Sequence, residues 1–159
     1  MSDSYVIRPL APDQIPQAYP LVAIFDPKLT QEQWSKYAGA LISEHADRDR
    51  HSIITVQSSQ GDIYGLSVYW LRPDLREGRI LEIENFTVVD LVGNRTAARV
   101  LLEALQDAAL DLDCSCISIS LLNPQMRKWL REPKNPAMDL FRSSGFRGEQ
   151  LRLRKCFET

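Results

Sequence analysis

Residues 79–102, RILEIENFTVVDLVGNRTAARVLL, decide which fold this sequence predicts. The first eleven residues are rich in β-branched and aromatic side chains and predict a long strand. From residue 97 to residue 112, apolar residues recur three and four apart, which predicts an amphipathic helix. A strand that leads through a loop, residues 91–96, into a helix presents several free backbone N–H groups to one point, where the helix dipole is positive. We therefore expect the amides of residues 94–98 to bind an anion such as a diphosphate.

Shorter elements precede and follow this unit. Before it, the sequence predicts a strand over residues 5–10, a helix over 14–24 with Asp13 as its N-cap, a helix over 31–45 opened by a capping box of Thr30 and Gln33, and a hairpin of strands 52–57 and 63–71. After it come a strand over 115–122, a short helix over 137–144 ended by Gly145, and strand character over 146–157, as one strand or a hairpin through Gly148. This order predicts one domain, residues 1–159, with a mixed α/β (α+β) fold. Its sheet has about seven strands, with four main helices on both faces.

Composition places the chain among soluble globular proteins. Of its 159 residues, 44% are hydrophobic and 25% charged, and the formal net charge is −2. Three cysteines, with no C-x-x-C spacing, suggest neither a disulfide framework nor a metal site, so we expect no metal. The sequence shows no signal peptide and no apolar run of about 20 residues. We therefore expect a cytoplasmic protein that does not act at a membrane.

Charge is distributed unevenly along the chain. Residues 124–155 carry nine basic and three acidic residues, while the rest carries ten basic and eighteen acidic residues. A basic C-terminal third suggests an anionic ligand bound toward that end, although a solvated surface without a ligand explains the charge equally well. No nucleic-acid reader motif accompanies it, so nucleic acid is not an expected partner.

Three segments resemble the GCN5-related N-acetyltransferase (GNAT) family, and the resemblance covers essentially the whole chain. Residues 79–89 look like the long fourth strand of the family, and residues 93–102 look like its pyrophosphate loop and the helix that follows. Residues 137–146, AMDLFRSSGF, look like its closing helix and the Gly-Phe that ends it. The resemblance implies a sheet splayed between strands four and five. It also implies an enzyme, a monomer or homodimer, that moves an acetyl group from acetyl-CoA to a primary amine by direct attack.

The resemblance also assigns the residues that bind acetyl-CoA. The pyrophosphate would lie against the loop and first helical turn, and the pantetheine chain would pair with the end of the fourth strand. The loop departs from the family pattern, because Gly93 replaces the leading basic or amide residue and Thr96 replaces the central glycine. A threonine hydroxyl and the charge of Arg95 can still contact a phosphate. The candidate cofactor-binding residues are Phe86, Thr87, Val88, Val89, Gly93, Asn94, Arg95, Thr96, Ala97 and Ala98.

Glu82 and Glu84 are the candidate catalytic residues. Two residues apart on a strand, their carboxylates share one face at a separation of roughly 7 Å. An ammonium must lose a proton before it attacks a thioester, and a carboxylate can accept that proton directly or through water. In the family a glutamate of the fourth strand often has this role, and by its spacing from the loop Glu82 is the closer match. A structural ion pair with Arg72, Arg76 or Arg79 is the alternative.

The remaining chemistry is less well defined by the sequence. An N–H near Val88 would polarise the thioester carbonyl. Phe141 corresponds to the tyrosine that often acts as general acid in the family, so Ser118 or Ser120 supplies the proton or the thiolate leaves unassisted. The acceptor, a small molecule or a peptide amine, would bind beside the first two helices. A non-catalytic CoA-sensing or partner-binding module of the same fold is the alternative function.

Overall fold

The computed structural model describes residues 4–43, 51–89, 95–120, 131–132, 136–148, 155 and 157. The elements in chain order are β1 (Val6–Pro9), η1 (Pro12–Gln14), α1 (Ile15–Phe25), α2 (Gln31–Ser43), β2 (His51–Gln57), β3 (Ile63–Asp74), β4 (Gly78–Val88), α3 (Arg95–Asp111), β5 (Cys116–Ile119) and α5 (Pro136–Ser143). The long strand and the amphipathic helix predicted from residues 79–112 are therefore confirmed as β4 and α3.

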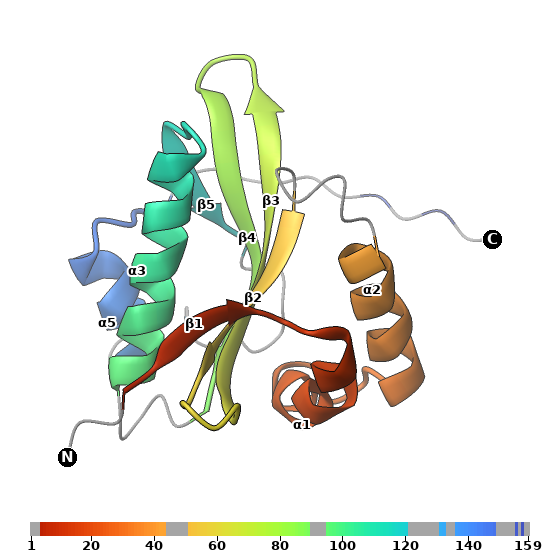
Figure 1. The fold of residues 1–159 in the computed structure, drawn as a ribbon. Helices are drawn as coiled ribbons and strands as arrows, with labels where there is room; N and C mark the ends of the chain where they lie inside the picture. The colour runs from red at the N-terminus through yellow and green to blue at the C-terminus, as the bar shows by residue number, and fades with distance from the viewer. Residues whose placement is uncertain are drawn as a thin grey trace.

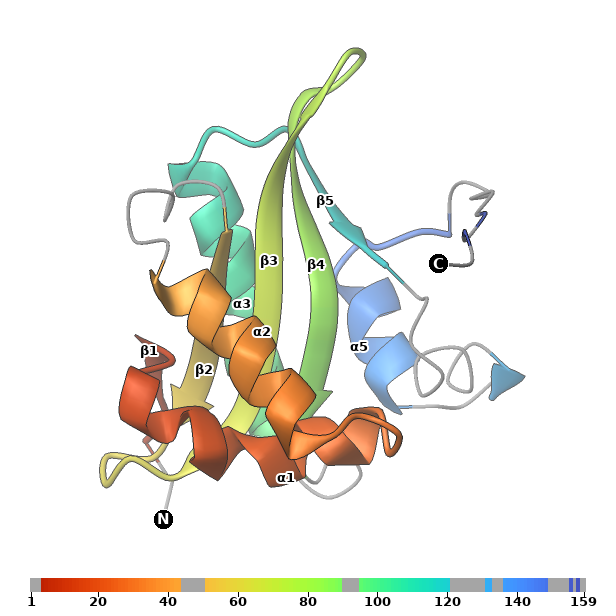
Figure 2. The same cartoon turned by 90° about the vertical axis from the view of Figure 1, so that its right-hand side faces the viewer.

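The sheet has the order β1-β2-β3-β4-β5. Its first four strands pair antiparallel, and β5 joins β4 in parallel. The β4–β5 pairs run only from Ile80 opposite Cys116 to Ile83 opposite Ile119, and beyond them β5 diverges from β4 (Figure 2). The prediction of about seven strands is wrong for the described residues, which form five. A strand needs a neighbouring edge as well as an alternating sequence, and residues 146–148 have no regular structure.

Helices cover both faces of the sheet, as predicted. Figure 1 shows α1 and α2 on one side of the sheet and α3 and α5 on the other. Each pair encloses its own core. One core contains Trp34 and Ala38 of α2 with Leu66 and Val68 of β3, and the second, larger core lies under α3 and α5. Within the described ranges, no helix has both the length and the apolar character needed to cross a bilayer.

The ends of two helices follow local sequence rules, and one helix start does not. The Thr30 hydroxyl accepts the Gln33 N–H at 3.1 Å and the Gln33 side chain accepts the Thr30 N–H at 2.9 Å, which confirms the capping box. Gly145, with φ of 94°, confirms the end of α5. Asp13 is not an N-cap: it lies inside η1, which extends the start of α1, and the side chain of Gln14 accepts the Ala11 N–H at 3.1 Å instead.

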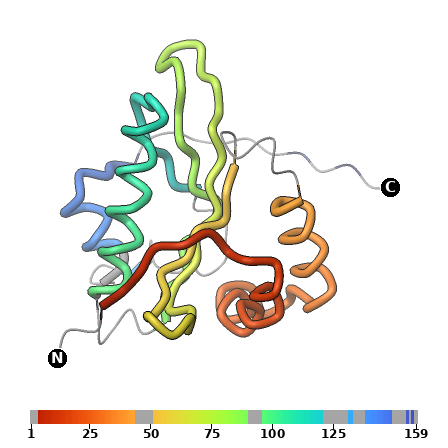
Figure 3. The backbone as a smooth tube through the Cα atoms, in the orientation of Figure 1, coloured from red at the N-terminus to blue at the C-terminus, as the bar shows by residue number. Residues whose placement is uncertain are grey.

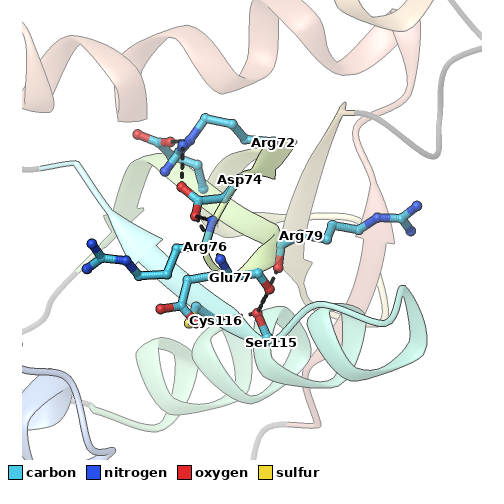
Figure 4. Close-up of polar contacts among 8 residues, drawn as sticks. Arg72, Asp74, Arg76, Glu77, Arg79, Ser115 and Cys116 are labelled. Carbon is cyan, nitrogen blue, oxygen red and sulfur yellow. Dashed lines mark hydrogen bonds and ion pairs between the residues drawn. The ribbon is translucent and has the colours of Figure 1, made fainter.

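The β3–β4 hairpin extends beyond the neighbouring strands (Figure 3), and its turn is held by the Asp74 carboxylate. Oδ1 of Asp74 accepts the N–H groups of Glu77 and Arg76 at 2.8 and 2.9 Å, which lowers the pKa of this carboxyl group. Ser115, just before β5, donates its hydroxyl to the Glu77 carbonyl (Figure 4). These contacts fix where β5 joins β4, and therefore where the two strands separate.

Candidate active site on strand β4

Glu84 is the extra residue of a β-bulge in the middle of β4. The antiparallel register with β3 pairs Tyr69 with Ile83 and Val68 with Asn85, so Glu84 has no partner on β3. The bulge follows directly after Ile83, the last β4 residue that pairs with β5. A bulge of this kind re-aims the side chain and shifts the alternation of the strand. The sequence contains one sign of the bulge that the predictions above did not use: at Glu84-Asn85 the apolar alternation shifts by one residue, from Leu81 and Ile83 to Phe86 and Val88.

The bulge determines which backbone groups of β4 face the opening beside β5. The Val89 N–H donates to the Tyr64 carbonyl at 2.8 Å, so by alternation Val89 and Thr87 direct their backbone groups at β3. Phe86 and Val88 direct theirs at the opposite edge, and β5 pairs only with the first half of β4. Among the four strand residues predicted to bind pantetheine, the geometry thus favours Phe86 and Val88, whose N–H and C=O groups have no strand partner among the described residues.

Glu82 forms an ion pair with Arg72. Its Oε2 accepts the Arg72 Nε–H at 2.9 Å, and the same guanidinium contacts the Asp74 carboxylate at 3.3 Å. Glu82 raises the pKa of Arg72. Figure 4 shows the link between this guanidinium and Asp74. The structural ion pair that the sequence allowed with any of three arginines is therefore formed with Arg72.

Glu84 has a different partner, a tyrosine of α2. The Tyr37 hydroxyl donates to Oε2 of Glu84 at 2.8 Å, although the carboxylate itself is exposed. Burial raises the pKa of the Tyr37 phenol well above its usual value, the charge of Glu84 adds to this shift, and the nearby Trp70 N–H opposes it to a smaller extent. The phenol therefore remains protonated over the physiological pH range and always has a proton to donate.

The two carboxylates share the α1/α2 side of the sheet, as their spacing predicts. Glu82 lies opposite Trp70 of β3, which packs against the core under α1 and α2, and Glu84 reaches Tyr37 of α2. Nothing in the sequence predicted the hydrogen bond between Tyr37 and Glu84. Only the packing of α2 across the sheet brings these residues, 47 positions apart, into contact.

The first turn of α3 lies at the same end of the sheet as the last residues of β4 (Figures 1 and 2). Ala97 and Ala98 are buried in the core that also contains Val88, while Thr96 is exposed. The N–H groups in the first turn of a helix have no intrahelical acceptor, so the start of α3 remains the candidate site for the diphosphate. Arg95 is the first residue of α3. Gly93, Asn94 and the side chain of Arg95 lie outside the described residues.

Phe141 is a core residue on the α3/α5 side of β4. Its ring packs edge-to-face on Phe86 at 5.2 Å and on Phe146 at 5.8 Å, measured between ring centroids. The position that resembles the family's tyrosine thus lies beside Phe86, one of the residues that face the opening. Ser118 lies opposite Glu82 in the parallel register. No group of three or more metal-ligating side chains occurs among the residues that the structure describes.

No protein-family model matches the sequence, and no curated protein matches it. Solved structures do match, over almost the whole chain. An aminoglycoside N-acetyltransferase in complex with CoA has a TM-score of 0.76 at 12% identity, covering 100% of this chain and 98% of that one. Glucosamine-6-phosphate N-acetyltransferase from Arabidopsis thaliana has a TM-score of 0.68 at 14% identity, covering 98% and 99%. Ribosomal-protein-alanine N-acetyltransferase from Brucella melitensis biovar Abortus 2308 has a TM-score of 0.68 at 17% identity, covering 97% and 100%.

These similarities define the class of fold. The chain has the fold of the GCN5-related N-acetyltransferases, with β4, α3 and α5 in the places that the sequence resemblance assigned to them. At 12–17% identity the similarity concerns the fold, and what the chain does must be argued from its own residues.

Proposed function

We propose that this protein is an acetyl-CoA-dependent N-acetyltransferase that acetylates a primary amine by direct attack. One observation carries the proposal: amide donors and carboxylates occur on neighbouring residues of one strand, at the point where β4 and β5 separate. Phe86 and Val88 direct their amides into the opening, and Glu84 lies two residues before Phe86 in the bulge. This is the pairing of an oxyanion donor with a base that acyl transfer to an amine requires.

The residues of β4 and α3 account for binding of the acyl donor. Acetyl-CoA, when bound, supplies the thioester whose carbonyl carbon is attacked. The N-terminus of α3 would hold its diphosphate, and the open edge of β4 would pair with the pantetheine amides. The N–H of Val88 would donate to the thioester carbonyl oxygen and stabilise the negative charge that develops there.

Glu84 is the better candidate for the base, and Glu82 for the fixed charge. Arg72 occupies one oxygen of Glu82, whereas Glu84 is exposed and can pass a proton to water. An incoming ammonium would lose its proton to Glu84 and attack as the free amine, while the charge of Glu82 attracts the cation. The thiolate can leave without a proton donor at position 141, because a thiol with a pKa of about 8.5 forms a stable enough thiolate.

The acceptor would approach from the α1/α2 side, where both carboxylates lie. Its class, a small molecule or a peptide with a free amine, is part of the proposal. So are the monomeric or homodimeric state and the absence of nucleic-acid and membrane partners. The similar structures include proteins whose names specify an aminoglycoside, a sugar phosphate and a ribosomal-protein alanine as acceptors. A panel of these three amine classes is therefore a reasonable first screen.

Turnover measurements on two glutamine variants test the proposal. Glu84→Gln is expected to lower kcat about 100-fold or more, the usual range for loss of a general base, while calorimetric binding of CoA is retained. Glu82→Gln is expected to act mainly on the KM of the amine. Glu77→Gln, the same change in the turn just before β4, is a matched control that should behave as wild type. Unchanged turnover in Glu84→Gln would refute the assignment of the base.

The alternative function, a CoA-sensing or partner-binding module without catalysis, is favoured by one observation. The side chain at position 141 is a buried phenylalanine with no proton to give. CoA binding without turnover for any amine of the panel would support this alternative. If neither CoA nor acetyl-CoA binds, the acetyltransferase and the CoA-sensing function are both refuted, and only a partner-binding module is left.

A further inference from the structure

Tyr37 is the polar group that connects α2 to the bulge of β4. It lies one helical turn after Trp34, whose indole N–H donates to the Ile15 carbonyl at 2.8 Å and fixes α2 to α1. The Tyr37 ring lies 6.2 Å from the Trp34 ring, measured between centroids. Figure 2 shows α2 crossing in front of the sheet, and Trp34 and Tyr37 both pack in the core that this helix shares with β3. The phenol is thus held by the packing of the helix.

The hydroxyl of Tyr37 has one well-formed hydrogen bond among the described residues, the 2.8 Å bond to Oε2 of Glu84. The Trp70 N–H lies near enough to influence the phenol, but its buried Nε1 has no hydrogen-bond partner among the described residues. One oxygen of Glu84 is therefore occupied, and the other has no hydrogen-bond partner within the part of the chain that the structure describes. Without this bond, the exposed carboxylate would be free to rotate about its side-chain torsions.

We propose that Tyr37 is a positioning residue for the acceptor half-reaction: its hydroxyl orients the Glu84 carboxylate so that the free oxygen meets the incoming amine. This inference rests on the proposed function, in which Glu84 accepts the proton. It assigns to α2 a role in catalysis besides its role in the core. The bulge and the hydroxyl act together, because the bulge moves Glu84 out of the register with β3 and the phenol holds the displaced side chain.

A variant that removes only the hydroxyl is the direct test. Tyr37→Phe keeps the ring against Trp34, so the fold is expected to survive, which thermal unfolding will check. Misplacement of a reacting group by about 1 Å can cost on the order of 100-fold in rate. We therefore expect Tyr37→Phe to lower kcat about 10- to 100-fold, with CoA affinity and the KM for acetyl-CoA unchanged.

Two controls separate positioning from a general structural effect. Tyr19→Phe removes the comparable hydroxyl of α1, which donates to the Leu29 carbonyl at 2.8 Å, and should leave kcat unchanged. In a double-mutant cycle, Tyr37→Phe should have no further effect in the Glu84→Gln background, because the carboxylate that it orients is gone. The same cycle measured by urea unfolding should show coupling between the two side chains, independently of turnover.

Each outcome bears on a different conclusion. If Glu84→Gln abolishes turnover and Tyr37→Phe leaves kcat at the wild-type value, the positioning role is overturned and the proposed function stands. If Tyr37→Phe lowers kcat equally in the wild-type and Glu84→Gln backgrounds, Tyr37 does not act through Glu84 and the inference is again overturned. A wild-type protein that acetylates no amine of the panel overturns the proposed function and, with it, the positioning role.

Discussion

Gly65 of β3 is the position at which a single methyl group should disturb the binding edge of β4. It pairs with Val88 across the β3–β4 edge, and the Val88 amide that we propose for the thioester carbonyl points to the opposite edge of the same strand. A Cβ at this residue would lie 2.8 Å from Cγ1 of Val56 and 3.1 Å from both the Thr87 carbonyl oxygen and Cγ2 of Val88. Normal carbon–carbon contacts are about 3.5–4.0 Å, so neighbouring atoms must move by up to about 1 Å.

The size of the effect follows from what those neighbours are. Val56 is fully buried, and its branched side chain has few alternative rotamers, so it cannot move aside at little cost. The Thr87 carbonyl belongs to the sheet backbone and moves only if β4 moves. Overpacking of this kind typically costs about 1–3 kcal/mol. For a chain of this length that corresponds to a decrease in Tm of roughly 2–12 °C.

Urea and thermal unfolding of Gly65→Ala measure this cost against a matched control. Gly39 lies in the helical backbone of α2, and a Cβ added there would have no atom within 4 Å, so Gly39→Ala should stabilise the protein by about 0.5–1 kcal/mol. Calorimetric measurement of CoA binding then tests the open edge of β4, and Gly65→Ala should weaken the affinity for CoA. If Gly65→Ala is as stable as wild type and binds CoA equally well, the close packing of β3 on β4 is not what holds the Val88 amide in place.

Three further predictions concern the contacts around the site. Trp34→Phe removes the bond to the buried Ile15 carbonyl and leaves a small cavity, which should cost about 2–4 kcal/mol in urea unfolding. Arg72→Met breaks the partly exposed ion pair with Glu82 and should cost less than about 1 kcal/mol in the free energy of unfolding; a larger loss would contradict the small contribution expected of an exposed pair. Burial raises the pKa of Tyr37, so the folded state retains its proton while the unfolded state loses it. The contribution of this proton to the free energy of unfolding is complete below about pH 10 and is lost as the pH rises further. Urea unfolding between about pH 8 and 11 should therefore show wild type losing stability faster than Tyr37→Phe.

The fold was largely predictable because its main elements have local signals. The capping box at Thr30, the glycine that ends α5 and the periodicity of α3 each depend on residues within a few positions of one another. The predictions that were wrong concern features that depend on residues far apart in the sequence. Asp13 has the right residue type for a cap, but η1 extends the helix start past it. Strand character after residue 145 did not add strands among the described residues, because pairing requires an edge that sequence patterns do not contain.

The sequence predicted where the candidate residues lie on the strands and helices, but not which residues they contact. Spacing alone placed Glu82 and Glu84 on one face, and the order of elements placed the start of α3 beside the end of β4. The sequence left Arg72 as one of three possible partners for a glutamate, and nothing in it indicated that Tyr37 contacts Glu84. Long-range partners of this kind depend on strand register and helix crossing, which no short segment encodes.

By itself, then, the sequence determined the elements, their order, the class of fold and the strand that carries the candidate chemistry. Tertiary structure alone decided which amides of β4 face the opening, which carboxylate is held by an arginine and which by a tyrosine. The physical reason is that helix caps and apolar periodicity depend on residues a few positions apart, whereas strand pairing and the bulge at Glu84 are defined only by the partner strand. The different partners of the two glutamates, Arg72 for Glu82 and Tyr37 for Glu84, follow from strand register and from the packing of α2.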